Sequence, residues 1–222
     1  MKTLGSGVYD TIKRKVDDSK YVRIITRAGR YLKDGFTEIE NGEKAFSTEN
    51  SIIPLTNGIY EGDRLLKLAK AETYKATQEL KKHTPGTKTD KEARYQLLLS
   101  KEKSLAALLA DKAIKLAGWH IKNVESSIKS GDNDTDQKYK RDCYEWANAS
   151  LSSANATVNY FKDHAESSND KSMKNNFEEQ KTKLRFLNKE LNQRFAKLPP
   201  KKRSLLDDVT SHNSGGRWGF DR

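Results

Sequence analysis

The sequence is poor in cysteine, in proline and in long apolar runs: it has one cysteine and four prolines in 222 residues. A single cysteine, Cys143, excludes an internal disulfide, and we interpret it as a small apolar side chain of the core. No stretch approaches the ~20 consecutive apolar residues that a membrane-spanning helix needs. The first residues are followed by charges rather than by an apolar run, unlike a secretory signal. We therefore expect a protein that is soluble and intracellular at synthesis.

Apolar residues are also scarce overall, at 34% of the chain against 33% charged residues, and the mean hydropathy is -0.92. A composition of this kind favours narrow buried stripes on long, solvated helices over a thick globular core. The few prolines and glycines cluster outside the long periodic segments. Composition alone therefore predicts an all-α protein.

Two stretches carry apolar residues at steps of three and four, the spacing that places side chains on one face of a helix. A polar run at residues 166–170 separates them, and a short break between long helices makes the helices antiparallel neighbours. The pattern predicts a helical hairpin, residues 138–166 and 170–196. Its stripes are Tyr139, Cys143, Trp146 or Ala147, Leu151, Ala154, Val158 and Phe161, and then Met173, Phe177, Gln180, Leu184, Leu187, Leu191 and Phe195.

The same periodicity predicts two helices upstream, residues 63–83 and residues 91–130, the second about 60 Å long at 1.5 Å per residue. Their stripes are Leu66, Ala69, Thr73, Ala76 and Leu80, and Leu98, Leu105, Leu109, Ala113, Leu116, Trp119 or His120, Val124 and Ile128. We predict an elongated antiparallel bundle of three to four long helices, residues 61–197.

The segment before this bundle, residues 1–60, is predicted to be a basic region that is partly helical and partly made of turns. Tyr21, Ile24, Ile25, Ala28, Tyr31 and Leu32 share one helical face. We expect Gly29 to weaken this helix and Gly35 to end it. Asn41-Gly42 and Asn57-Gly58 are turn signals, so a small hairpin fits between them.

The net charge of +11 is concentrated at the two ends of the chain. Residues 1–33 carry +6 and residues 197–222 carry +3, whereas the 163 residues between them carry +2. Basic ends on a nearly neutral body predict contacts with something acidic. The candidate anion or phosphate contacts are Lys13, Arg14, Lys15, Arg23, Arg27, Arg30, Lys201, Lys202 and Arg203.

The last segment, residues 198–222, is predicted to be an extended docking arm, because Pro199 and Pro200 cannot continue a helix. A tryptophan and a phenylalanine that follow a flexible Gly-Gly joint are typical of an anchor in a partner's pocket. The candidate docking residues are Leu205, Leu206, Val209, Trp218 and Phe220.

The sequence contains no arrangement of residues that is typical of catalysis, of a metal site or of a cofactor site. The four histidines are widely spaced, and no nucleophile motif or phosphate-binding loop occurs. We therefore expect a non-enzymatic protein without metal or cofactor.

These features predict a structural protein, one subunit of a larger assembly held by its C-terminal arm. Its partners would be further copies of itself and other subunits. In architecture alone, the predicted chain resembles the small helical connector proteins of tailed-virus necks, so a ring or connector of a viral particle is one such assembly. The alternative is a basic nucleic-acid-binding or packaging protein whose two ends contact phosphates without sequence specificity. A membrane-surface contact through the basic N-terminal helix ranks below both.

Overall fold

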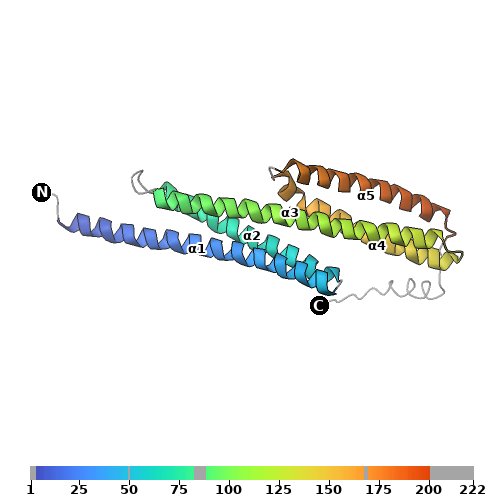
Figure 1. Cartoon of the computed structure of the whole chain (residues 1–222). Coiled ribbons are helices and arrows are strands. Elements are labelled where there is room, and N and C mark those ends of the chain that lie inside the picture. The colour runs from blue at the N-terminus through green and yellow to red at the C-terminus, as the bar shows by residue number, and fades with distance from the viewer. Residues whose placement is uncertain (1–3, 50, 83–88, 168–169, 201–222) are drawn as a thin grey trace, which may run out of the picture.

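The computed structural model describes residues 4–49, 51–82, 89–167 and 170–200, with side chains for residues 19–48, 51–82, 90–167 and 170–200. These residues form five helices: α1 (Leu4–Glu49), α2 (Ile52–Lys81), α3 (Thr89–Asp132), α4 (Gln137–Glu166) and α5 (Lys171–Lys197) (Figure 1). No strand occurs among the described residues. The predicted all-α class and the antiparallel helical bundle are confirmed.

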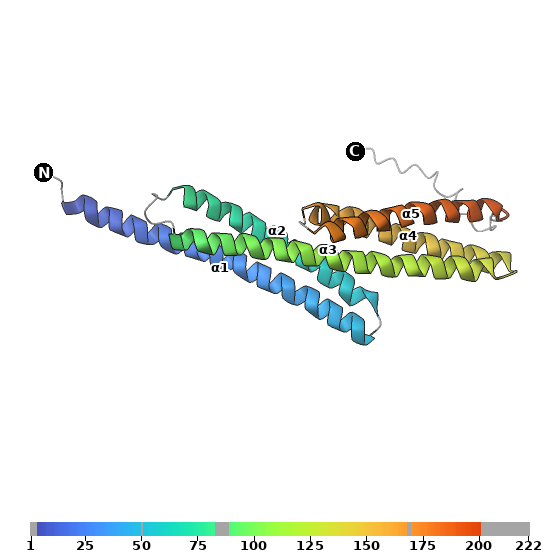
Figure 2. The ribbon, with the colours of Figure 1, turned by 45° about the horizontal axis from the view of Figure 1, so that its top comes forward.

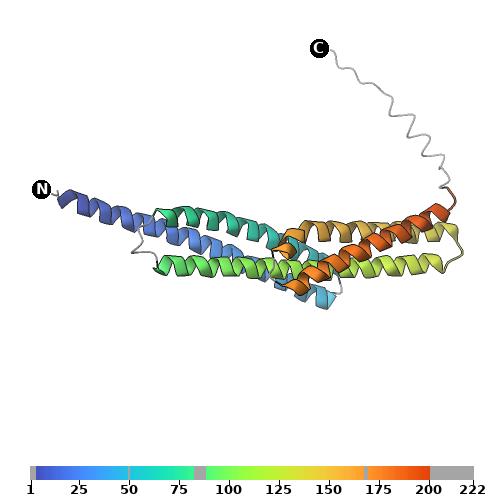
Figure 3. The same cartoon turned by 90° about the horizontal axis from the view of Figure 1, so that it is seen from above.

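The five helices form an elongated body in which α3 packs against two helical hairpins (Figure 2). The first part of α3 packs against the hairpin of α1 and α2, and its second part packs against α4 and α5. Seen from above, α5 lies obliquely across α3 and α4 (Figure 3). The molecule is therefore two three-helix bundles joined by one continuous helix.

Most residues of the predicted apolar stripes form the core, whereas Tyr139, the first residue of the predicted α4 stripe, is exposed. On α3, the residues from Leu98 to Ile128 are buried at every stripe position except Trp119 and His120, which are half-buried. On α5, Phe177, Leu184, Leu187 and Leu191 are buried. The helices predicted at 91–130, 138–166 and 170–196 are thus confirmed to within two residues at each end.

Local sequence explains where the last two helices begin. The side chain of Asp136 accepts a hydrogen bond from the backbone N–H of Lys138 at the start of α4. Asp170 does the same for Ser172 and Met173 at the start of α5. An aspartate at this position satisfies N–H groups that have no partner within the helix.

The prediction for residues 1–60 is wrong in its turns, and the number of long helices is five rather than three to four. Helix α1 runs through Gly35 to Glu49, and α2 begins at Ile52, about ten residues before its predicted start. Pro54 lies in the first turn of α2, where a missing N–H leaves no hydrogen bond broken. The predicted boundary between units at residue 60 stays a prediction, although α2 runs through that position.

The glycines that predicted turns are sites of close contact between α1 and α2. A Cβ atom at Gly42 would lie 2.6 Å from the carbonyl oxygen of Pro54. A Cβ atom at Gly58 would lie 2.6 Å from the carbonyl oxygen of Glu38. Both distances are too short for a real contact, so only glycine allows the two backbones to approach this closely.

Trp146 lies outside the core, contrary to its predicted place on the stripe of α4. Its neighbour Ala147 is fully buried, whereas Trp146 is 72% exposed. Steps of three and four admit either residue, and the small alanine occupies the contact with α3. The outer face of α4 therefore carries a large exposed aromatic side chain.

The contact between α1 and α2 predicts opposite effects of one substitution at different glycines. Gly42→Ala and Gly58→Ala should each destabilise the fold by about 1–3 kcal/mol, because the added methyl group collides with a backbone carbonyl. Gly29→Ala should stabilise it by up to about 1 kcal/mol, because alanine favours the helix and nothing lies within 4 Å of the new atom. Urea unfolding measures all three. A loss at Gly29 equal to that at Gly42 would contradict this packing.

Candidate functional site

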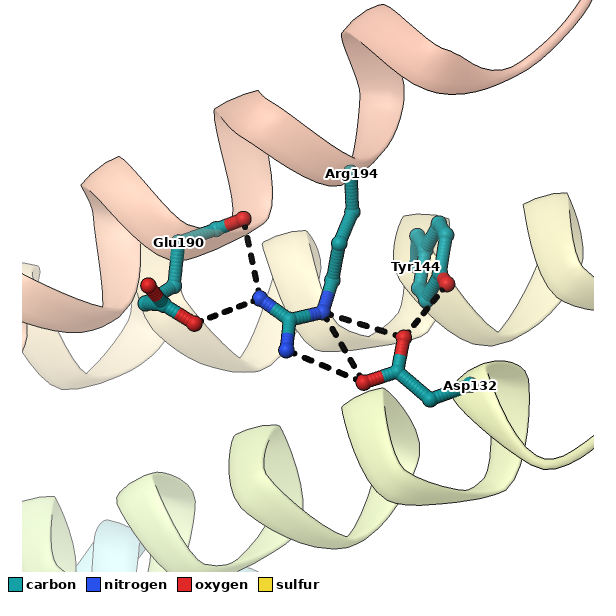
Figure 4. A network of polar contacts seen from close by, with 4 residues as sticks. All are labelled: Asp132, Tyr144, Glu190 and Arg194. Atoms are coloured by element: carbon teal, nitrogen blue, oxygen red, sulfur yellow. Dashed lines mark hydrogen bonds and ion pairs between the residues drawn. The ribbon is translucent and has the colours of Figure 1, made fainter.

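A network of polar side chains joins three helices at the end of the molecule where α3 meets α4 (Figure 4). Arg194 of α5 pairs with Asp132 at the end of α3, with 2.9 Å between Nη2 and Oδ2. Tyr144 of α4 donates a hydrogen bond of 2.7 Å to the other carboxylate oxygen of Asp132. Arg194 also contacts Glu190, one turn earlier on α5, with 2.6 Å between Nη1 and Oε2. One arginine therefore holds the C-terminal end of α5 against α3 and α4.

Gly131, in the last turn of α3, allows the Tyr144 ring to reach this network. A Cβ atom at Gly131 would lie 2.6 Å from the ring of Tyr144, so the ring lies directly over the last turn of α3. Burial, followed by the hydrogen bond to Asp132, raises the pKa of Tyr144 to about 12. The hydrogen bond from Arg194 lowers the pKa of Asp132. The tyrosine therefore stays a donor and the aspartate stays charged over the physiological pH range.

The same end of the molecule fixes the point from which the C-terminal segment departs. The backbone N–H of Leu198 donates to the carbonyl oxygen of Phe195 after the last turn of α5. Arg141 of α4 donates from Nη2 to the carbonyl oxygen of Pro199. The described chain thus ends at Pro200 beside the first turns of α4. The predicted docking and basic residues of the arm lie outside the described residues: Lys201, Lys202, Arg203, Leu205, Leu206, Val209, Trp218 and Phe220.

The outer face of α4 begins at this point and holds a shallow hollow of about 390 Å³. Two carboxylates, the exposed Trp146 and a small residue line it: Asp142, Glu145, Trp146 and Ala149. An exposed aromatic side chain beside charged groups is typical of an interaction surface.

The predicted arginines of α1 form a second exposed surface. Arg23, Arg27 and Arg30 lie on one side of the helix and line a shallow groove of about 290 Å³ with Val22 and Thr26. Arg27 lies 3.6 Å from the buried carboxylate of Glu72, and Arg23 bonds to Ser19, one turn before it. All three arginines are exposed. Lys13, Arg14 and Lys15 lie on α1, but their side chains are outside the described part of the structure.

A third cluster, at the junction of the two bundles, was not predicted. Asp63 of α2 is 1% exposed. Its carboxylate accepts hydrogen bonds of 2.8 Å from Tyr160 and from His164, both on α4. Lys67, one turn further along α2, lies 2.7 Å from the same carboxylate. Side chains from two helices that share no hairpin therefore meet on one buried charge.

Asp63 is held charged by these three neighbours. Burial by itself would raise its pKa, but the hydrogen bonds from His164, Lys67 and Tyr160 together outweigh burial and lower it to about 2. A buried carboxylate with several donors is stable only as long as the donors stay in place. The cluster therefore fixes the position of α4 relative to α2.

His164 also borders a cleft of about 550 Å³ between α2, α3 and the turn from α4 to α5. The cleft is lined by groups of both charges, among them Lys70, Glu102, Lys103 and Asp170. Burial raises the pKa of Glu102, against the opposing effect of a hydrogen bond from Thr73. The His164 ring already forms a hydrogen bond with Asp63. No group of three or more metal-ligating side chains occurs among the described residues.

Comparisons of the chain with protein-family models, with curated proteins and with solved structures find no match. Among the helices of the described chain, none is long and apolar enough to cross a membrane.

We predict that the free energy of unfolding depends on pH through the Asp63 carboxylate at the junction of the two bundles. A pKa lowered from 3.8 to about 2 contributes about 2 kcal/mol to folding at neutral pH. Because the folded-state pKa is the lower one, this contribution is complete above about pH 4 and disappears as the pH falls toward 2. Asp63→Asn should therefore cost about 2 kcal/mol at pH 7, and the variant should converge with the unaltered protein at the acid end.

Urea unfolding at a series of pH values from 7 to 2 makes this measurement. Glu61→Gln is the matched control, because it removes a partly exposed carboxylate on the same helix that pairs with Arg64, one turn further along, and not with Lys67. That change should cost well under 1 kcal/mol at any pH. A difference between Asp63→Asn and the unaltered protein that stays constant from pH 7 to pH 2 would show that the carboxylate's charge is not what stabilises the junction.

Proposed function

We propose that this chain is a non-enzymatic structural protein, one subunit of a larger assembly held by its C-terminal arm. The observation that carries the proposal is the fixed origin of the arm. Arg194 and Arg141 hold α5 and Pro199 at the end of an elongated body. A segment that departs from a fixed point can reach a neighbouring subunit in a defined direction, which a ring or a shell requires.

The described side chains support a structural role over a catalytic one. The polar clusters at the junction and at the arm's origin connect helices, and each charged group in them has a partner. His164, which borders the cleft of about 550 Å³, is hydrogen-bonded to Asp63. Groups that serve packing in this way are not poised to exchange protons with a substrate.

In the proposed assembly, Trp218 and Phe220 dock on a neighbouring subunit, and Leu205, Leu206 and Val209 add apolar contacts. The neighbour is a second copy of this chain, with other subunits bound beside it. A ring or connector of a viral particle is the form of assembly that an elongated helical subunit with a terminal arm suits best.

The second candidate function is non-specific nucleic-acid binding, which the arginine face of α1 favours. Three guanidinium groups within two helical turns match the charge and spacing needed to contact successive phosphates. In that reading the basic residues at both ends, rather than the aromatic anchors, hold the partner.

Mass in solution at high salt separates the two candidates. Trp218→Ala with Phe220→Ala should reduce the oligomer to a monomer with unchanged helix content, because apolar docking hardly responds to salt whereas phosphate contacts weaken steeply. Light scattering measures the mass, and circular dichroism measures the helix content.

The matched control changes Arg23, Arg27 and Arg30 together to Gln, which removes charge from α1 and leaves the arm intact. Under the proposed function this variant assembles like the unaltered protein. An oligomer that survives loss of both aromatic anchors would rule the arm out as the assembly element. A complex that needs the three arginines and dissociates with salt would establish the second candidate in its place.

A further inference from the structure

The chain leaves α5 at the rim of an exposed face of α4. Arg141, which contacts the carbonyl oxygen of Pro199, lies on the side of α4 that is turned toward α5. At 3.6 residues per turn, Glu145, Asp142 and Trp146 follow around the helix at about 40°, 100° and 140° from Arg141. A chain that continues around α4 from Pro199 therefore passes two carboxylates before it reaches the exposed indole ring.

The shape and chemistry of this face of α4 are those of a binding surface for a short extended segment. Asp142, Glu145, Trp146 and Ala149 line its hollow. One to two turns further along α4, the exposed side chains on the same face are small: Ser152, Ser153 and Ala156. Small side chains behind an aromatic ring leave room for apolar groups to lie flat against the helix.

We propose that residues 201–209, the first half of the C-terminal arm, dock on this face of their own subunit. The segment begins with three basic residues, Lys201, Lys202 and Arg203, which pass the carboxylates of Asp142 and Glu145. Leu205 and Leu206 follow and cover Trp146. Charge and apolar character thus occur in the same order along the arm and around α4.

The length of the segment fits this path. An arc of 140° on the surface of a helix about 10–12 Å in diameter measures about 12–15 Å. Trp146 also lies about 7.5 Å further along the axis of α4 than Arg141, so the path measures about 14–17 Å. The five residue steps from Pro200 to Leu205 span about 17–18 Å when extended. A chain that leaves Pro200 is therefore long enough to bring Leu205 to Trp146 after the basic triplet.

The segment that binds this face of α4 belongs to the same subunit, because residue 201 directly follows Pro200 at the edge of the face. The arm of a second copy would have to displace a segment tethered within a few residues of the face, and tethering gives the subunit's own segment a high effective concentration. The docking of residues 201–209 does not depend on what Trp218 and Phe220 bind. It places Leu205, Leu206 and Val209 on the subunit's own α4 rather than on the neighbour, and it leaves residues 210–222 as the part of the arm that reaches a neighbour.

Shielding of Trp146 from acrylamide tests the proposal in the full-length chain. Trp119→Phe with Trp218→Phe leaves Trp146 as the one fluorescent tryptophan. Changing Lys201, Lys202 and Arg203 to Glu should raise its quenching constant about twofold, because the covering side chains leave the ring. Asp142→Lys with Glu145→Lys should have the same effect. Combining the two sets of changes should restore shielding, since the charges again complement each other.

Lys171→Glu with Lys174→Glu, at the other end of α5, is the control and should leave the quenching constant unchanged. Equal quenching in all variants would overturn the proposal, as would a combined variant that stays unshielded. Shielding that disappears on dilution would overturn it too, because the occupant would then be the arm of another copy. Measuring mass on the same samples keeps this result separate from the proposed assembly, which concerns Trp218 and Phe220.

Discussion

Helix α3 must bury an apolar stripe along most of its length, and the rest of the structure depends on that constraint. From Leu98 to Ile128 the stripe is about 45 Å long at 1.5 Å per residue. Each hairpin covers one part of it, α1 with α2 the first and α4 with α5 the second. Each fully buried leucine or isoleucine contributes about 1.5–3 kcal/mol of transfer free energy. Exposing either part would cost several such contributions, so both hairpins are held to the same helix.

Two polar clusters add what apolar burial cannot, namely a defined position along α3. Asp63 at the junction and Asp132 at the far end each accept hydrogen bonds from other helices. Removing the partners of the buried Asp63 carboxylate is costly, so the cluster penalises other arrangements of α2 and α4. Asp132 is more exposed and is held by Arg194 and Tyr144. The second cluster has a functional consequence, because it fixes the origin of the arm. Both proposals, the assembly through the arm and the binding of residues 201–209 on α4, depend on that fixed origin.

Periodicity predicted α3, α4, α5 and most of the core, because these follow from residues a few positions apart. The function of the glycines could not be predicted in this way. A glycine preceded by asparagine is a local turn signal, whereas the contact of Gly42 with Pro54 and of Gly58 with Glu38 exists only after two helices pack. The spacing of seven from Gly35 to Gly42 and of four from Gly58 to Gly62 was the available signal, since both place glycines on one helix face. Asp63 and His164 are 101 residues apart, and no sequence pattern joins them.

The central claim is that α3 and the junction make the two bundles one body, and a distance between the bundles tests it most directly. Spin labels would replace two exposed residues, Tyr74 on α2 and Phe186 on α5, in a background where the buried Cys143 is alanine. Pulsed electron paramagnetic resonance should then give a single narrow distance distribution, which broadens when Asp63 is changed to Asn. A broad distribution with the junction intact would show that the bundles move independently, and would contradict the account.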